Sequence, residues 1–547
     1  PLGFRQFQSI DLGRWSGRGK VPRLREVLAA IERRLQDPGI PAPSDAPPSR
    51  RRRGGPSLNM WAVIAVSIGM FFVVVGLLIG RPWERTSSGV PTVSVGASDN
   101  SQLSRSVAEG VRANLGSIQG NSATNFRLAD TQSKATPDLE VTVASTQHGQ
   151  GFETNVAVVS PSDRTVLWSK QLRLPAAQRA VLGQAVAYAV ARPLGCAAEE
   201  RSSTSGRLSA ETRRRYLIAC TTIEEAEDPR SLVSDFRKII AEAPKFGPAW
   251  GHLLFAETNL LNFSHGAGEP TEKIRADLSR DIAAARKIDP DMAEATVAEV
   301  ELDPPTAFLH SMALIDKVNA SHPDNAIVLD ERSSLLQRVG RMFDSAQDAK
   351  RAADVEPYSP LFRANYVKAM AYSGGIEKAW EELAKAKQLW PDSAVIADAD
   401  YALNLRFGDF EKTWRASGRA VEGGIDGYFK ILRDPSAANI DAWVRLAKTH
   451  DLNDGERQFV YGALPAMGRV DQDYQFMGEW PVEKDFERQT YVLFRPWLNN
   501  LRRDPRFMRL AQRLGLLEYW QKSGKWPDFC DEADLPYHCK EEAAKLK

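Results

Sequence analysis

Four cysteines are the side chains of this sequence with the clearest capacity for chemistry. They are Cys196, Cys220, Cys530 and Cys539. In an oxidising compartment such residues form disulfides, and four cysteines allow three pairings. Their close spacing along the chain favours Cys196 with Cys220 and Cys530 with Cys539, so we expect two short covalent loops.

Other chemistry finds little support in the residue pattern. His538 lies between Cys530 and Cys539, but three candidate ligands without C-x-x-C spacing argue against a zinc site. The sequence contains no G-x-x-x-x-G-K-[ST], G-x-G-x-x-G, G-x-S-x-G or H-E-x-x-H motif, and its seven histidines are scattered. We therefore expect no catalytic residue, cofactor or metal ligand in this chain.

The composition narrows the range of functions further. The chain has 547 residues and a formal net charge of +1, and its length allows several domains of roughly 100–200 residues each. Binding to nucleic acid through bulk electrostatics requires an excess of positive charge. We expect a multidomain protein with no nucleic-acid partner.

A long apolar segment precedes all four cysteines and bears on the compartment in which they lie. Residues 60–80 carry no charged side chain, and at 1.5 Å of rise per residue they cover roughly 30 Å of hydrocarbon. Trp61 and Trp83 stand at the two ends, where aromatic rings favour the membrane interface. A buried core helix is the alternative, but such helices are usually shorter and rarely apolar on every face. The pattern predicts one transmembrane helix over residues 58–80.

The flanking charges predict the orientation of this helix. Four consecutive arginines precede it: Arg50, Arg51, Arg52 and Arg53. Fewer positive charges follow it, so the positive-inside rule places the N-terminus in the cytoplasm. All four cysteines come after the span, which agrees with an oxidising compartment on the far side. No small-x-small cleavage site follows, so we expect a retained signal anchor.

One face of the predicted span consists of small residues. Ala65, Gly69, Gly76 and Gly80 are spaced by four, seven and four residues. This small-x-x-x-small pattern allows two spanning helices to approach closely, which suggests self-association. The alternative is that glycine is simply common in membrane helices.

Residues 1–36 carry a strand pattern followed by a helix pattern. "FRQFQSIDLGRW" alternates apolar and polar residues, and "VPRLREVLAAIERRLQDP" gathers apolar residues on one helical face. The segment resembles the C-terminal end of a bacterial TIR (Toll/interleukin-1 receptor) domain. The residues that carry the resemblance are Pro1, Leu2, Phe4, Arg5, Gln8, Ile10, Asp11, Leu12 and Trp15. A strand and helix of another cytoplasmic domain is the alternative.

This resemblance implies an α/β domain that acts by self-association. Its nucleotide-binding loop, and the glutamate of its NAD-cleaving members, would lie upstream of Pro1, so no catalytic residue is assigned. Residues 37–57 are rich in proline and arginine and predict an extended linker to the membrane. The resemblance implies a bacterial inner (cytoplasmic) membrane with the C-terminal region in the periplasm.

Residues 90–197 predict a compact α/β domain. "PTVSVGA", "FRLAD", "DLEVTVAS", "ETNVAVVS" and "RTVLWSKQL" are strand patterns, and helices are expected at "SQLSRSVAEGVRANLGSI" and "AAQRAVLGQAVAYAVA". This order resembles the TolB-like domain that follows the membrane span in bacterial receptors carrying helical repeats. Any other small α/β sandwich is the alternative.

Residues 205–520 predict an all-α repeat region. Prolines that would end helix pairs recur every 33 or 34 residues, and glycines recur every 34. They are Pro290, Pro323, Pro357 and Pro391, with Gly340, Gly374 and Gly408. The pattern resembles the tetratricopeptide repeat (TPR), which implies a stacked solenoid whose concave face binds a peptide or protein. We interpret Trp250, Tyr372, Trp380 and Trp390 as packing between helices rather than as a binding site.

The end of the chain predicts a cap. An apolar stripe at helical spacing would close the open end of the solenoid; it consists of Phe494, Trp497, Leu501, Phe507, Leu510 and Leu514. Residues 521–547 would form a tail held by the second disulfide, with little core of its own.

Two classes of function follow from these patterns. The favoured one is a single-pass membrane signalling or scaffold protein, in which a periplasmic TPR module binds a protein or peptide and is coupled to a cytoplasmic TIR domain. The alternative is a membrane-anchored enzyme whose catalytic domain lies mostly upstream of this chain. That domain would be an NAD-cleaving TIR domain or, less favoured, a nucleotide cyclase.

Overall fold

The computed structural model describes residues 90–121, 124–130, 136–203, 208–266, 268–418, 423–449 and 452–546, which belong to one compact unit. The predicted TIR fragment (1–36), linker (37–57) and transmembrane helix (58–80) lie outside the described residues. So do the four arginines at 50–53 and the small-residue face formed by Ala65, Gly69, Gly76 and Gly80. These features stay predictions.

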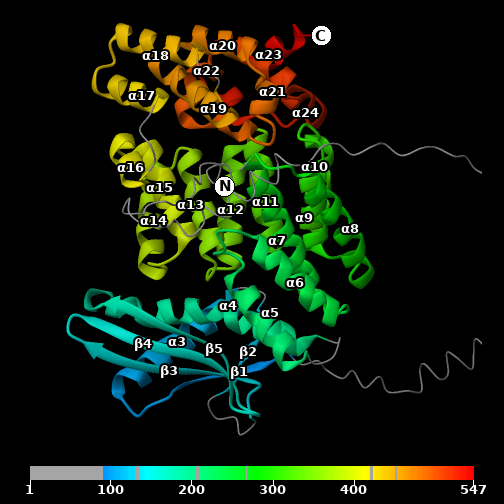
Figure 1. The fold of residues 1–547 in the computed structure, drawn as a ribbon, viewed down its shortest axis with the longest axis vertical. Coiled ribbons are helices and arrows are strands. Elements are labelled where there is room, and N and C mark those ends of the chain that lie inside the picture. The colour runs from blue at the N-terminus through cyan, green and yellow to red at the C-terminus, as the bar shows by residue number, and fades with distance from the viewer. Residues whose placement is uncertain are drawn as a thin grey trace, which may run out of the picture. The chain divides into compact units, whose positions relative to one another are not determined.

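A five-stranded mixed sheet forms the N-terminal part of the described chain (Figure 1). Its strands are β1 (Thr92–Ala97), β2 (Arg127–Leu128), β3 (Leu139–His148), β4 (Gly151–Ser160) and β5 (Thr165–Pro175), in the order β2-β1-β3-β4-β5. β1 pairs in parallel with β2 and β3, and the other pairs are antiparallel. Burial alternates along β3, as the period-2 pattern of its residues predicts. The five strands expected from the sequence are confirmed.

Two helices cover one face of the sheet: α3 (Gln102–Asn121) and α4 (Leu182–Ser202). They pack closely because glycines face each other. A Cβ atom on Gly183 would lie 3.0 Å from the Cα of Gly110, so larger residues would push the helices apart.

Among the described residues, one apolar stretch is long enough to cross a membrane, and most of it is helix α4. This stretch is Ala176–Ser202, and 56% of its most apolar window is buried inside the protein. Leu182, Val186 and Val190 are almost fully buried in the core of the sheet domain. Packing against the sheet therefore accounts for its apolar character.

The core of the sheet continues into the first helices that follow it. These are α5 (Ala210–Thr222), α6 (Arg230–Glu242) and α7 (Gly247–Gly266). Tyr216, Phe236 and Phe246 are fully buried in the same cluster as Val186 of α4. The predicted boundary near residue 200 thus separates two stretches of chain that share one hydrophobic core.

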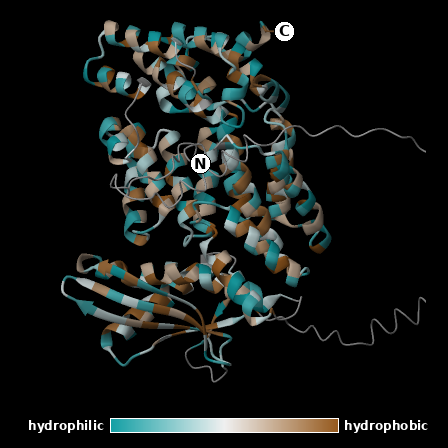
Figure 2. Ribbon diagram, viewed as in Figure 1, coloured by the Kyte–Doolittle hydropathy of each residue, from teal (hydrophilic) through white to brown (hydrophobic). Residues whose placement is uncertain are grey.

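The repeat region consists of consecutive helices that pack on one another. They are α8 (Glu272–Ile288), α9 (Ala293–Leu302), α10 (Phe308–Ser321), α11 (Ala326–Arg338), α12 (Met342–Val355), α13 (Pro360–Tyr372), α14 (Ile376–Leu389), α15 (Ala394–Phe407) and α16 (Phe410–Ala416). Hydrophobic and hydrophilic residues alternate along them (Figure 2), as expected for helices packed on one side.

The repeating prolines and glycines lie where the sequence places them. Each proline follows the second helix of a pair, and each glycine lies between the two helices of a pair. A third residue recurs with the same period. Asn325, Ser359 and Ser393 are the N-caps of α11, α13 and α15, and each side chain accepts a hydrogen bond from a backbone amide three residues later.

Shorter helices form the C-terminal part. They are α17 (Gly423–Arg433), α18 (Ala437–Thr449), α19 (Asp454–Ala463), α20 (Val470–Glu479), α21 (Val482–Asp485), α22 (Asn499–Arg502), α23 (Arg506–Arg513), α24 (Leu516–Ser523) and α25 (Cys539–Ala544). The predicted stripe from Phe494 to Leu514 does not form one helix, because its residues fall on several short turns and helices. Except for the partly buried Trp497, its members are buried in one common core.

The C-terminal part packs on the end of α11 as well as on the last helix pair, where the ring of Phe407 on α15 lies 5.9 Å from that of Trp497. The indole Nε1 of Trp520 donates to the carbonyl of Val339 at 2.9 Å, and the amide of Asp528 donates to the carbonyl of Gly340 at 3.1 Å. The tail beyond residue 520 also differs from the expectation, because Phe529 and Tyr537 are buried in the same core.

Candidate functional site

The four cysteines form the two disulfides that their spacing favours. Cys196–Cys220 joins α4 to α5, and Cys530–Cys539 joins a short 3-10 turn to α25. Both sulfur atoms near His538 are therefore bonded to each other and are not available as zinc ligands. Cys196 and Cys220 are each 1% exposed, so their disulfide is a buried crosslink rather than a reactive one.

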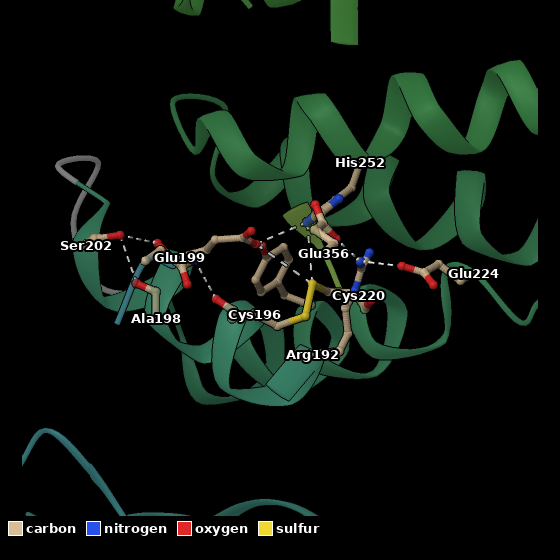
Figure 3. A network of polar contacts seen from close by, with 12 residues as sticks. Arg192, Cys196, Ala198, Glu199, Ser202, Cys220, Glu224, His252 and Glu356 are labelled. Atoms are coloured by element: carbon tan, nitrogen blue, oxygen red, sulfur yellow. Dashed lines mark hydrogen bonds and ion pairs between the residues drawn. A yellow bond between two sulfur atoms is a disulfide. The ribbon is translucent and has the colours of Figure 1, made fainter. Parts of the chain in front are cut away.

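A polar network surrounds the buried disulfide Cys196–Cys220 (Figure 3). The Nε2 atom of His252 on α7 lies 3.1 Å from a carboxylate oxygen of Glu199 on α4 and 3.4 Å from the sulfur of Cys220. The hydroxyl of Tyr216 donates to the same oxygen of Glu199. Burial alone would raise the pKa of the Glu199 carboxyl. The charge of His252 and hydrogen bonds from His252 and Tyr216 outweigh it and lower that pKa.

Arg192 on α4 extends this network to the repeat helices. Its guanidinium lies 2.6 Å from a carboxylate oxygen of Glu224, after α5, and 3.8 Å from one of Glu356, after α12. Its Nε also donates to the carbonyl of Cys220 at 3.3 Å. Burial raises the pKa of Glu356 to about 7, with repulsion from Glu224 and Glu199 adding to burial and Arg192 opposing it.

The network lacks the parts of a metal centre or a nucleophilic site. Glu199, Cys220 and His252 offer three ligand atoms within 4.8 Å of one another, but the sulfur of Cys220 is bonded to Cys196 and is not a thiolate. Tyr216 is fully buried, and burial and Glu199 raise the pKa of its hydroxyl. The contacts join α4, α5 and α7 to Glu356, which follows α12, and together these residues form a wall.

This wall borders a cavity of about 710 Å³ between α4, α5, α7 and the starts of α11 and α13. A second cavity of about 110 Å³ lies along α7, α9, α11, α13 and α15. The two cavities share four lining residues: Phe255, Glu294, Ile327 and Leu361. We call the two adjoining cavities the groove.

Sequence reasoning missed the residues of the groove, although the repeat contains a signal for them. Equivalent positions of successive first helices line the smaller cavity. Ile327, Leu361 and Val395 are 34 residues apart, as are Asp330, Ala364 and Asp398, and also Glu331 and Asn365. The polar or charged residues among them, Asp330, Asp398, Glu331 and Asn365, are the signal that marks the lining of the groove.

The aromatic residues weighed in the sequence do not line the groove. Tyr372 is buried in the C-terminal core, and Trp250 and Trp380 pack against helix cores. Trp390 stacks on Tyr188 of α4 with ring centroids 5.5 Å apart. Their contacts agree with the interpretation as packing.

No protein-family model and no curated protein sequence matches this chain.

Proposed function

We propose that this chain is a single-pass membrane signalling or scaffold protein. Its described part is a periplasmic binding module, built from a TolB-like domain and a TPR-type helical solenoid, that holds a protein or peptide in the groove. The helix over residues 58–80 anchors this module in the bacterial inner membrane. A cytoplasmic TIR domain, of which residues 1–36 are the end, receives the signal.

The observation that carries this proposal is the groove. Five first helices contribute side chains to its smaller cavity, and the larger cavity of about 710 Å³ exceeds the space left by ordinary packing defects. Concave surfaces built from stacked helix pairs commonly bind extended partners.

The two disulfides support the placement outside the cytoplasm. All four cysteines are paired, and the described part holds no free thiol. Disulfides persist in oxidising compartments and are rare in the cytosol.

Reporter fusions test the placement. A reporter joined after residue 45 should report the cytoplasm, and one joined after residue 90 should report the periplasm, because four arginines precede the span. The reverse result would contradict the proposal, and so would a cytoplasmic readout from both fusions.

The coupling across the membrane has its own test. We propose that the small-residue face of the span holds a dimer, so that the outer module can change the geometry of two TIR domains. Gly76→Ile combined with Gly80→Ile should weaken self-association of the full chain in a membrane reporter assay. Unchanged self-association would contradict a dimer on this face, and the coupling would then have to run through the soluble domains.

A further inference from the structure

The smaller cavity of the groove is lined by more carboxyl groups than basic groups, and burial raises the pKa of two of these carboxyls, Asp330 and Glu331. Asp330, Glu331 and Glu294 line it, and among the described residues no basic side chain forms an ion pair with any of the three. The one lysine in its lining is Lys368, which pairs with Asp398 at 3.2 Å. Acidic groups held at a partly enclosed site attract a cation more strongly than they would in water.

Two buried hydrogen-bond acceptors in the cavity have no donor among the described residues. Asn365 is 5% exposed, and its amide group donates to both carboxylate oxygens of Asp330 at 2.9 and 3.0 Å. These two bonds fix the orientation of the amide. Within the part of the chain that the structure describes, its Oδ1 has no hydrogen-bond partner, and neither has Oε1 of Glu331. Leaving a buried acceptor unpaired is unfavourable, so a ligand that supplies donors would be stabilised here.

Apolar side chains from α7, α9, α11, α13 and α15 form another part of the lining, namely Phe255, Val297, Ile327, Leu361 and Val395. The uncharged polar side chains of Thr258, Asn259, Asn262 and Ser334 lie beside them. A cavity needs about 10–15 Å³ to hold one water, so about 110 Å³ admits a group of several heavy atoms. The fitting chemistry is therefore a cation on a short hydrocarbon chain.

We propose that this cavity binds a primary ammonium group carried on an alkyl chain. An ammonium has three donors, which can meet the free oxygens of Asn365 and Glu331, while its methylene groups contact the apolar walls. The source is either the side chain of a lysine in a bound peptide or a free alkylamine. This inference rests on the proposed function and names the chemistry by which the groove selects its ligand.

The test is calorimetric titration of the purified full chain with three probes. They are acetyl-Gly-Lys-Gly-amide, the same peptide with norleucine in place of lysine, and n-butylammonium. Norleucine keeps a hydrocarbon chain and lacks the ammonium. The lysine peptide should bind at least 10-fold more tightly than the norleucine peptide. If n-butylammonium binds as tightly as the lysine peptide, a free amine is a sufficient ligand. If n-butylammonium does not bind, the ligand is the lysine side chain of a peptide.

Matched variants locate the site. Glu331→Gln should weaken binding of the ammonium probe at least 10-fold, whereas Glu381→Gln, which makes the same charge change on an exposed face of α14, should leave it within 2-fold. If Glu331→Gln does not fold, as judged by circular dichroism, Glu294→Gln replaces it with the same expectation. Equal binding of the lysine and norleucine peptides would overturn the inference, as would equal effects of the groove variant and Glu381→Gln. If a partner protein crosslinks to the groove but the lysine and norleucine peptides bind equally, the proposed function stands and only the ammonium inference is wrong.

Discussion

The carboxylate of Glu225 accepts a hydrogen bond from the hydroxyl of Ser393, 168 residues away in sequence, at 2.6 Å. Its other oxygen accepts the amide of Ala394 at 2.9 Å. The preceding residue makes the equivalent contact one repeat earlier, since Glu224 accepts from the hydroxyl of Ser359 at 2.7 Å. Two consecutive glutamates after α5 thus bind the starts of α13 and α15, where the helix dipole favours negative charge.

Glu225→Ala should loosen the start of α15. A hydrogen bond to a charged group contributes about 1.5–3 kcal/mol, so we expect the free energy of unfolding to fall by about 1–2 kcal/mol. Amides at the start of α15 should exchange with solvent faster in mass-detected hydrogen exchange. Glu227→Ala, an exposed glutamate of the same turn, is the control and should change neither quantity. Equal exchange in the two variants would show that the contact does not hold the repeat in place.

The two disulfides should contribute unequally to stability. Cys196 and Cys220 are 24 residues apart, and Cys530 and Cys539 are nine apart. Chain-entropy arguments give roughly 3.5 kcal/mol for the longer loop and roughly 2.5 kcal/mol for the shorter. Urea unfolding of the two double Cys→Ala variants measures both values. We expect the Cys196/Cys220 variant to unfold at the lower urea concentration, and the opposite order would contradict the buried-crosslink interpretation.

Gly340 and Gly374 occupy equivalent positions of successive repeats but differ in their surroundings. Both have a positive φ, +83° and +98°, so alanine at either position costs about 1–2 kcal/mol of backbone strain. A Cβ at Gly340 would also lie 2.7 Å from Phe494 and Pro527, whereas a Cβ at Gly374 meets nothing within 4 Å. Gly340→Ala should therefore lower the free energy of unfolding by about 1–3 kcal/mol more than Gly374→Ala. Equal losses in thermal or urea unfolding would mean that the C-terminal part does not pack on Gly340.

Glu356 should make stability depend on pH. Its pKa in the folded state is about 7, raised from an ordinary value of 4.5. The folded state therefore binds more protons than the unfolded state between these values, and stability falls as the pH rises through this window. Glu356→Gln removes the titration, so its free energy of unfolding relative to the native chain should increase by about 1–3 kcal/mol from pH 4.5 to pH 8. Urea unfolding at several pH values measures this, with Glu381→Gln as the control. A constant difference across the range would exclude Glu356 as the titrating group.

Local patterns predicted much of the fold because they act over short distances. Pro323 and Gly340 mark helix ends through their own backbone preferences, and the strands of residues 90–175 follow from alternation. The docking of Glu225 on Ser393 could not be predicted this way, since it depends on how distant segments pack. The stripe from Phe494 to Leu514 shows the same limit, because its residues are buried as expected but on several short helices arranged around Trp520.

The candidate site was predictable only in part. The spacing of the cysteines indicated the disulfide next to which the polar network forms. The acceptors of the groove were not identified, because Asp330 and Asn365 look like ordinary solvated helix residues until the helices stack and place them on one wall. Comparison of equivalent repeat positions would have revealed them.

The central claim, that the groove holds a protein or peptide partner, is tested most directly by crosslinking in intact cells of the native host. A photoreactive amino acid replaces Ile327, which lines both cavities, or Glu381 on the exposed face of α14 as the control. The account predicts a discrete adduct from position 327 that is absent from position 381. No adduct at position 327, or the same adducts at both positions, would contradict it.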